Sequence, residues 1–123
     1  MGVFSIKVTV ANPQDPARQQ LVELLVDTGA TLSIVPAVIL RDLGISPRRI
    51  GKEFETISGA IISRDIGQAL FQIDQEAEMT PVVVGEAADA PVLGAVTLEA
   101  LGFGVDPLRK RLIPQRFQAK QIQ

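Results

Sequence analysis

Cysteine and histidine are both missing from the 123-residue sequence. Without cysteine, the chain has neither disulfides nor a thiolate nucleophile. Without histidine, it lacks the base of Ser-His-Asp triads and Cys-His pairs, and the usual ligand of zinc sites. Any hydrolysis by this protein must therefore use carboxylates, lysine, or a metal held by oxygen ligands.

Long apolar runs and a strong excess of one charge are missing as well. No stretch approaches the roughly 20 apolar residues that span a bilayer, and residues 1–10 alternate polar with apolar instead of forming a signal-peptide core. Ile6 occupies the position where a myristoylation signal requires Ser or Thr. The net charge of −2 creates no field that attracts nucleic acid or an anionic membrane. We therefore expect a soluble, cytoplasmic protein without nucleic-acid or membrane partners.

The composition that remains is that of a globular domain. Apolar residues make up 46% of the chain and charged residues 21%, which is ordinary for folded proteins. A chain of this length can bury one core but is short for two. We predict a single domain over residues 1–123.

Alternation of polar and apolar residues, interrupted by turn residues, predicts many short strands and few helices. Strands are expected in a hairpin over residues 3–27, at 32–36, at 52–57 and 60–67 on either side of Ser58-Gly59, at 69–73, at 79–86, and in a strand–turn–strand unit over 104–114. Short helices are expected after Pro36, ending at Gly44, and over Val96–Leu101, ending at Gly102. This pattern indicates a mostly-β, barrel-like domain.

Two charged runs have more than one interpretation. "LRKRL" (Leu108 to Leu112) contains three consecutive basic residues, but no aromatic platform accompanies it as in nucleic-acid binders. "DQEAE" (Asp74 to Glu78) offers carboxylates, but it lacks the glycine and the ligand spacing of a calcium loop. We interpret both runs as solvated turns, and we expect no metal site and no cofactor.

The stretch "LLVDTGAT", Leu24 to Thr31, carries the main chemical signal. An apolar strand ends in a carboxylate, Asp27, and burying an unpaired carboxylate is costly. Asp-Thr-Gly can form a simple turn, in which Asp bonds a backbone N–H and Gly accepts positive φ. The context favours more than a turn, because an apolar-apolar-Gly unit, Val92 to Gly94, precedes a short helix downstream. A hairpin with a small, glycine-containing tip lies between the two.

These features in this order resemble the retropepsin-like (retroviral-type) aspartic proteases, roughly from Ser5 to Pro114. The resemblance implies an all-β fold, a closed acid-protease β-barrel with one or two short helices, which forms one lobe of a two-fold dimer. The core would cover about residues 4–114, and residues 115–123 would be either a frayed tail or a strand of the dimer interface. Thr31, Leu32 and Ala95 replace polar or charged residues of viral members, and the flap has no tyrosine, so the chain looks more like cellular or bacterial members.

The chemistry of that family explains the residue types. Aspartic proteases hold two carboxylates about 3 Å apart, and since both cannot ionise together, they share one proton and one pKa rises. This chain contains a single Asp-Thr-Gly. The resemblance therefore implies a homodimer in which Asp27 from each subunit forms the catalytic pair across an isologous interface.

Other positions take roles from the same resemblance. Support of the active-site loop is implied for Thr28, Gly29, Leu93 and Gly94. Contacts with substrate are implied for Gly29, Ala30, Ser58, Gly59, Ala60, Pro91 and Val92, of which Ser58, Gly59 and Ala60 would form the tip of a flap.

Two functions are compatible with these residues. The first is a homodimeric aspartic endopeptidase, in which a water activated by the Asp27 pair hydrolyses a peptide or protein substrate. The alternative is a non-catalytic dimeric module on the same fold that binds peptides or acts as a scaffold, because a fold does not dictate a function.

Overall fold

The computed structural model describes residues 3–122, and the structural statements below concern these residues. Nine strands and two short helices follow one another along them. In chain order they are β1 (Ser5–Asn12), β2 (Asp15–Val26), β3 (Ser33–Pro36), α1 (Ala37–Asp42), β4 (Arg49–Glu55), β5 (Ile61–Ile73), β6 (Glu76–Gly85), β7 (Val92–Leu93), α2 (Ala95–Leu101), β8 (Phe103–Asp106) and β9 (Arg111–Pro114).

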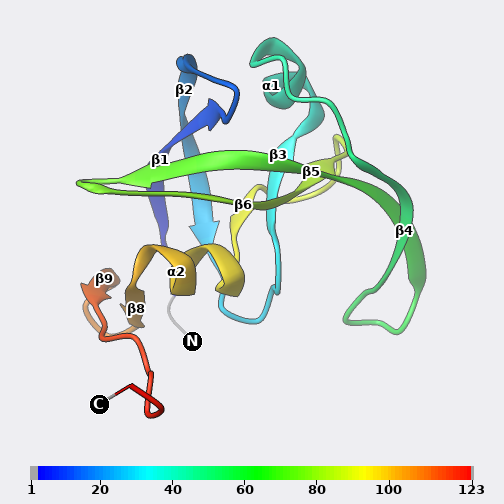
Figure 1. Cartoon of the computed structure of the whole chain (residues 1–123). Helices are drawn as coiled ribbons and strands as arrows, with labels where there is room; N and C mark the ends of the chain where they lie inside the picture. The colour runs from blue at the N-terminus through cyan, green and yellow to red at the C-terminus, as the bar shows by residue number, and fades with distance from the viewer. Residues whose placement is uncertain (1–2, 123) are drawn as a thin grey trace.

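The main sheet closes on itself. Its strands lie in the order β1-β2-β7-β3-β6-β5-β4, and an additional pairing of β1 with β5 joins strands near the two ends. Six strands therefore form a ring, and β4 extends outside it from β5 (Figure 1). The ring confirms the predicted mostly-β, closed-barrel fold with two short helices. The hairpin of β8 and β9 forms a separate two-stranded sheet.

Side-chain alternation explains why these strands bury one face. In β1, Val8 and Val10 are fully buried while Lys7 is exposed, and in β2, Leu24 is fully buried while Glu23 is exposed. Neighbouring side chains of a strand point to opposite faces, so this period of two directs the valines and leucines into the barrel. The core that results also contains Phe71 and is contiguous across the ring.

Both helices end where glycine was expected to stop them. Gly44 and Gly102 adopt positive φ values of 76° and 81°, the left-handed conformation that glycine reaches without a Cβ penalty. After α1, the side chain of Asn12 donates to the carbonyl oxygen of Leu43 at 2.9 Å, and Arg18 Nη2 donates to that of Asp42 at 2.6 Å. The β1–β2 hairpin thus satisfies carbonyls that the short helix leaves free.

One strand is longer than the sequence suggested. Residues 60–67 and 69–73 were expected as separate segments, but β5 runs without interruption from Ile61 to Ile73. Its first half pairs with β4 and its second half pairs with β6 and β1. A single strand therefore connects the projecting β4–β5 hairpin to the barrel wall.

The segment after β9 forms no strand within residues 115–122. The backbone N–H of Gln115 donates to the carbonyl of Gly102 at 2.8 Å, and the ring of Phe117 lies beside Gly102 although 72% of that residue is exposed. Both expected states of this segment, a frayed tail and a strand of the dimer interface, therefore stay predictions. Among the described residues, no helix has the length and apolar character needed to cross a membrane.

Candidate active site

Asp27 follows the last residue of β2, and neighbouring backbone holds it in place. Val26 N donates to Phe4 O at 2.9 Å, and Asp27 N donates to Leu93 O at 3.1 Å. Beside them, β2 pairs in parallel with β7, with Val26 opposite Leu93. The backbone at Asp27 is thus fixed from two sides, by Phe4 just before β1 and by Leu93 of the downstream apolar-apolar-Gly unit.

The carboxylate of Asp27 is half-buried and has few partners within its own chain. Its Oδ1 accepts a hydrogen bond from Gly29 N at 3.0 Å, and the carbonyl of Asp27 accepts from Ala30 N at 3.2 Å. Thr28 and Gly29 are exposed. No lysine or arginine forms an ion pair with Asp27 over residues 3–122. The strand before Asp27 is buried as expected, but in the single chain the carboxylate itself reaches the surface.

The second motif lies directly behind this loop. Ala95 N donates to Ala30 O at 2.8 Å, and Val96 N donates to Thr31 O at 3.0 Å, so the first turn of α2 bonds the carbonyls of the loop. A Cβ at Gly94 would lie 2.6 Å from the carbonyl carbon of Leu32. Only glycine permits this approach of the two backbones.

A buried cluster of three hydroxyls, which the sequence patterns did not reveal, joins the same segments. Ser33 Oγ accepts from Gly94 N at 2.9 Å and lies 2.7 Å from Thr97 Oγ1, which lies 2.9 Å from Thr80 Oγ1. Ser33 and Thr97 are fully buried, and Thr80 is 3% exposed. In the sequence, each of these three hydroxyls lies within an apolar segment. A hydroxyl that is buried requires a hydrogen-bond partner, and this was the signal that could have indicated the cluster.

The expected flap tip lies in the turn between β4 and β5. Thr56 N donates to Ala60 O and Gly59 N donates to Thr56 O, both at 2.9 Å, and Gly59 has a φ of 87°. Ser58, Gly59 and Ala60 are all exposed. In Figure 1 this hairpin projects from the barrel and its tip stands apart from the loop after β2. The single chain therefore does not bring the tip to Asp27.

The two expected wall residues lie closer to Asp27. Val92 and Leu93 are buried in β7, and Val92 faces Leu25 and Ile34 in the sheet. Pro91 is half-buried, and its carbonyl accepts from Leu25 N at 3.0 Å. Pro91 and Val92 thus border the strand that leads to the carboxylate.

Asp27 and Thr28 border an open hollow of about 490 Å³. Its other lining residues come from the N-terminal segment, α2, the β8–β9 hairpin and the tail, and they include Val3, Phe4, Leu98, Phe103, Val105 and Pro107. This face is mainly apolar and lies next to the carboxylate. Over residues 3–122, no three acidic side chains gather closely enough to hold a metal ion.

The ring of strands and the two motifs define the class of fold, that of the retropepsin-like aspartic proteases. The EIAV protease complexed with the inhibitor HBY-793 aligns with a TM-score of 0.62 and 18% identity, over 80% of this chain and 88% of that chain. A retropepsin-like aspartic protease from Rickettsia conorii aligns with a TM-score of 0.52 and 20% identity, over 85% of this chain and 86% of that chain. No protein-family model and no curated protein sequence matches the chain. At these identities the similarity establishes the fold alone.

Proposed function

We propose that the protein is a homodimeric aspartic endopeptidase with Asp27 as its catalytic residue. The observation that carries this proposal is the position of the Asp27 carboxylate. It is half-buried at the end of a barrel strand, on a loop held by Leu93 and α2, and among residues 3–122 its one hydrogen bond comes from Gly29 N. A carboxylate that is rigidly placed and lacks a cationic partner suits proton transfer.

A second copy of the chain would complete the site. The apolar face beside Asp27, formed in part by Phe4, Leu98 and Phe103, is the surface that a two-fold partner would cover. The Asp27 carboxylates of the two subunits would then meet at the axis, and Thr28 would bond across it. The two carboxylates would share one proton between them.

The reaction follows from that pair. The ionised carboxylate takes a proton from a bound water, and the water oxygen attacks the carbonyl carbon of the peptide bond. The protonated carboxyl donates to the carbonyl oxygen, which stabilises the tetrahedral intermediate, and a proton then passes to the leaving amine. No cofactor is needed, and the requirement for one shared proton favours acidic pH.

The substrate would be an extended peptide. The exposed backbone of Ser58, Gly59 and Ala60 would bond it from above as the flap closes, and Gly29 and Ala30 would line the floor. Pro91 and Val92 offer an apolar wall, while Thr31 and Ala95 bring no charge to the cleft. These contacts favour apolar side chains next to the cleaved bond.

The Asp27→Asn variant tests this function. We expect wild-type protein to cleave a mixed peptide library at acidic pH, and the variant to lose at least about a thousandfold in rate because asparagine cannot accept the proton. Product ends are sequenced from acidic to neutral pH. The matched control is Asp74→Asn, since Asp74 lies in an exposed turn at a φ of 54° that asparagine also tolerates.

Cleavage that survives in the Asp27→Asn variant would exclude the mechanism. A dimeric wild-type protein that binds peptides without cutting them would instead support the non-catalytic peptide-binding module on the same fold.

A further inference from the structure

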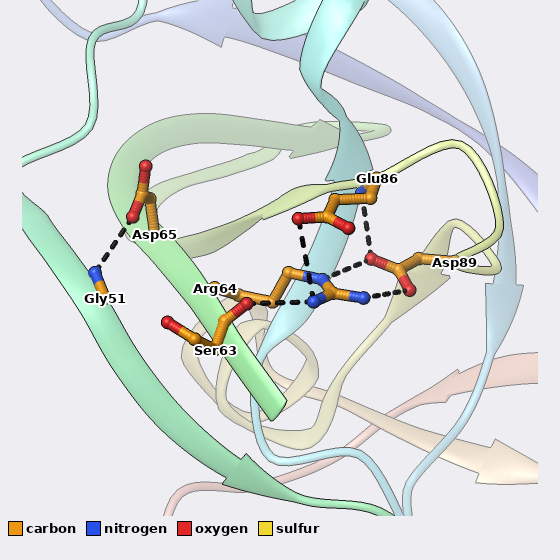
Figure 2. A network of polar contacts seen from close by, with 6 residues as sticks. All are labelled: Gly51, Ser63, Arg64, Asp65, Glu86 and Asp89. Carbon is orange, nitrogen blue, oxygen red and sulfur yellow. Dashed lines mark hydrogen bonds and ion pairs between the residues drawn. The ribbon is translucent and has the colours of Figure 1, made fainter. Parts of the chain in front are cut away.

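A bidentate ion pair joins the flap hairpin to the loop that precedes the cleft wall. Arg64, on β5, donates from Nε to Asp89 Oδ2 at 2.7 Å and from Nη2 to Asp89 Oδ1 at 2.8 Å (Figure 2). The two side chains are only 15% and 19% exposed. Two parallel charge-assisted bonds fix both distance and orientation, which a single contact does not.

The same carboxylate also shapes its own loop. Asp89 Oδ2 accepts from Glu86 N at 2.8 Å, and Asp89 N donates to Glu86 O at 2.9 Å, so residues 86–89 fold back on themselves. On the other side of the pair, Arg64 Nη1 donates to Ser63 O at 2.8 Å. Glu86 adds a distant contact to Arg64 at 3.7 Å from a side chain that is 67% exposed. Asp89 is therefore the group on which both the loop and the link depend.

The elements that this pair connects are those expected to enclose substrate. Arg64 lies in the part of β5 that pairs with β4, opposite Lys52, and the flap tip lies between these strands. Asp89 lies two residues before Pro91, whose carbonyl accepts from Leu25 N, and Val92 pairs with Leu25 in β2. The chain thus runs from the flap through the ion pair and the wall to the strand that ends at Asp27.

We propose that Arg64 and Asp89 are positioning residues which set the spacing between the flap hairpin and the Pro91–Val92 wall, and thereby determine the size of apolar side chain that the adjoining subsite accepts. This inference rests on the proposed protease function. When the ion pair is intact, the distance between the Pro91–Val92 wall and the flap strand is fixed. Without it, the loop moves independently of the flap and the subsite discriminates less by size.

The charges around the pair keep it formed in acid. The hydrogen bonds from Arg64, aided by the N–H of Glu86, lower the pKa of Asp89, and Asp89 in turn raises the pKa of Arg64. Arg41 and Glu86 line the same open hollow as Asp89, whereas Asp65 accepts from Gly51 N on the flap strand instead (Figure 2). The lowered pKa of Asp89 therefore keeps the pair ionised to a lower pH than an ordinary aspartate would allow.

The test compares two peptides that differ only in the apolar residue beside the cleaved bond, valine in one and phenylalanine in the other. Arg64→Met keeps the side-chain stem and the Asp89–Glu86 loop bond, and it removes the link together with the hydrogen bond from Arg64 to Ser63 O. For this variant, we expect the ratio of the two kcat/KM values, one for each peptide, to move about tenfold towards one. The change should come from KM, and kcat for the better peptide should be nearly unchanged. Asp89→Asn should behave alike, and Arg64→Lys should recover part of the ratio because it retains charge without the fork.

The matched control is Glu86→Gln, which removes the exposed outer charge and leaves the bidentate pair in place. Its ratio should equal that of wild type. If Arg64→Met and Asp89→Asn are folded and active but keep the wild-type ratio, the proposal is wrong.

Hydrogen exchange separates failure of this inference from failure of the protease function. In Arg64→Met, or in Arg64→Lys if the first variant does not fold, amides of residues 61–65 and 86–90 should both exchange faster than in wild type. That result supports the link even if wild-type protein cleaves neither peptide. Unchanged exchange in both segments overturns the inference, whatever the activity.

Discussion

At the scale of single residues, Asp27 and Gly94 act together through backbone. Asp27 N bonds the carbonyl of Leu93, and Gly94 follows at once with its Cα against the backbone of Ala30 and Leu32. The position of the Asp27 carboxylate thus depends on a glycine that lies 67 residues later in the sequence. Any side chain at Gly94 would push the loop that carries Asp27.

Gly94→Ala should therefore destabilise the protein by about 1–3 kcal/mol, the usual cost of forcing an extra methyl group into packed structure. The added Cβ would lie 2.6–2.9 Å from backbone atoms of Leu32 and Ala30, and these cannot rotate away as a side chain can. Urea unfolding measures the loss, and peptide cleavage should fall with it.

The control for this substitution is Gly67→Ala in β5. Gly67 is also buried, but the nearest atom to its added Cβ, Ser46 O, would be 3.3 Å away. We expect a clearly smaller loss of stability there. Equal losses of stability in the two variants would mean that the close approach of Gly94 to the Asp27 loop does not determine the effect of Gly94→Ala.

Sequence reasoning selected Asp27, Gly94 and the wall positions as candidates because each belongs to a short local motif. It missed the cluster of Ser33, Thr97 and Thr80, since these hydroxyls are 17 to 64 residues apart and only the fold brings them together. A buried hydroxyl in an apolar segment signals that a partner exists. It does not say which residue that partner is.

At the scale of elements, β5 has a double role that its sequence did not reveal. Its first half forms the flap with β4, and its second half forms the barrel with β6 and β1. Gly67 lies within the strand, at the end of the segment expected over residues 60–67. Pairing of Gly67 with Val82 keeps the strand continuous, so the β4–β5 hairpin is connected directly to the barrel wall.

The link between β5 and the 86–91 loop predicts a pH dependence of stability. Because the folded state lowers the pKa of Asp89, its contribution is complete above about pH 4, the ordinary pKa of aspartate, and is lost as pH falls through the lower folded pKa. The free-energy difference between wild type and Asp89→Asn should therefore stay constant from neutral pH to about pH 4 and shrink below it.

Urea unfolding at a series of pH values checks this dependence. Glu86→Gln serves as the comparison, because Glu86 lies 3.7 Å from Arg64 and is mostly exposed. A difference between wild type and Asp89→Asn that grows as the pH falls below about 4 would contradict the expected role of the ionised pair.

At the scale of the whole molecule, the proposed activity depends on the apolar face beside Asp27, because a second subunit would bind there. Val3, which is 62% exposed, lines this face together with Phe4 and Phe103. Exposed apolar surface of this kind, next to the Asp27 carboxylate, is suited to the proposed partner subunit. The proposed catalytic pair exists only when two copies meet there.

We expect the protein to sediment as a dimer at micromolar concentration, and activity per subunit to fall on dilution as monomers form. Removal of residues 115–123 should weaken the dimer at least about tenfold if the tail contributes to the interface. Thermal unfolding of the truncated monomer should change little, because residues 115–122 form no strand with the barrel. A strict monomer that still cleaves peptides would rule out the shared site.

The sequence by itself determined most of the strands, the two helix ends and the residue types of the candidate site. Alternation, turn residues and the Asp-Thr-Gly motif are local, so they can be read without knowing what packs against them. The tertiary structure alone decided the closure of β1 on β5, the buried hydroxyl cluster and the Arg64–Asp89 pair. Each of these joins residues that are far apart in the chain, and such contacts depend on how the barrel brings its strands together.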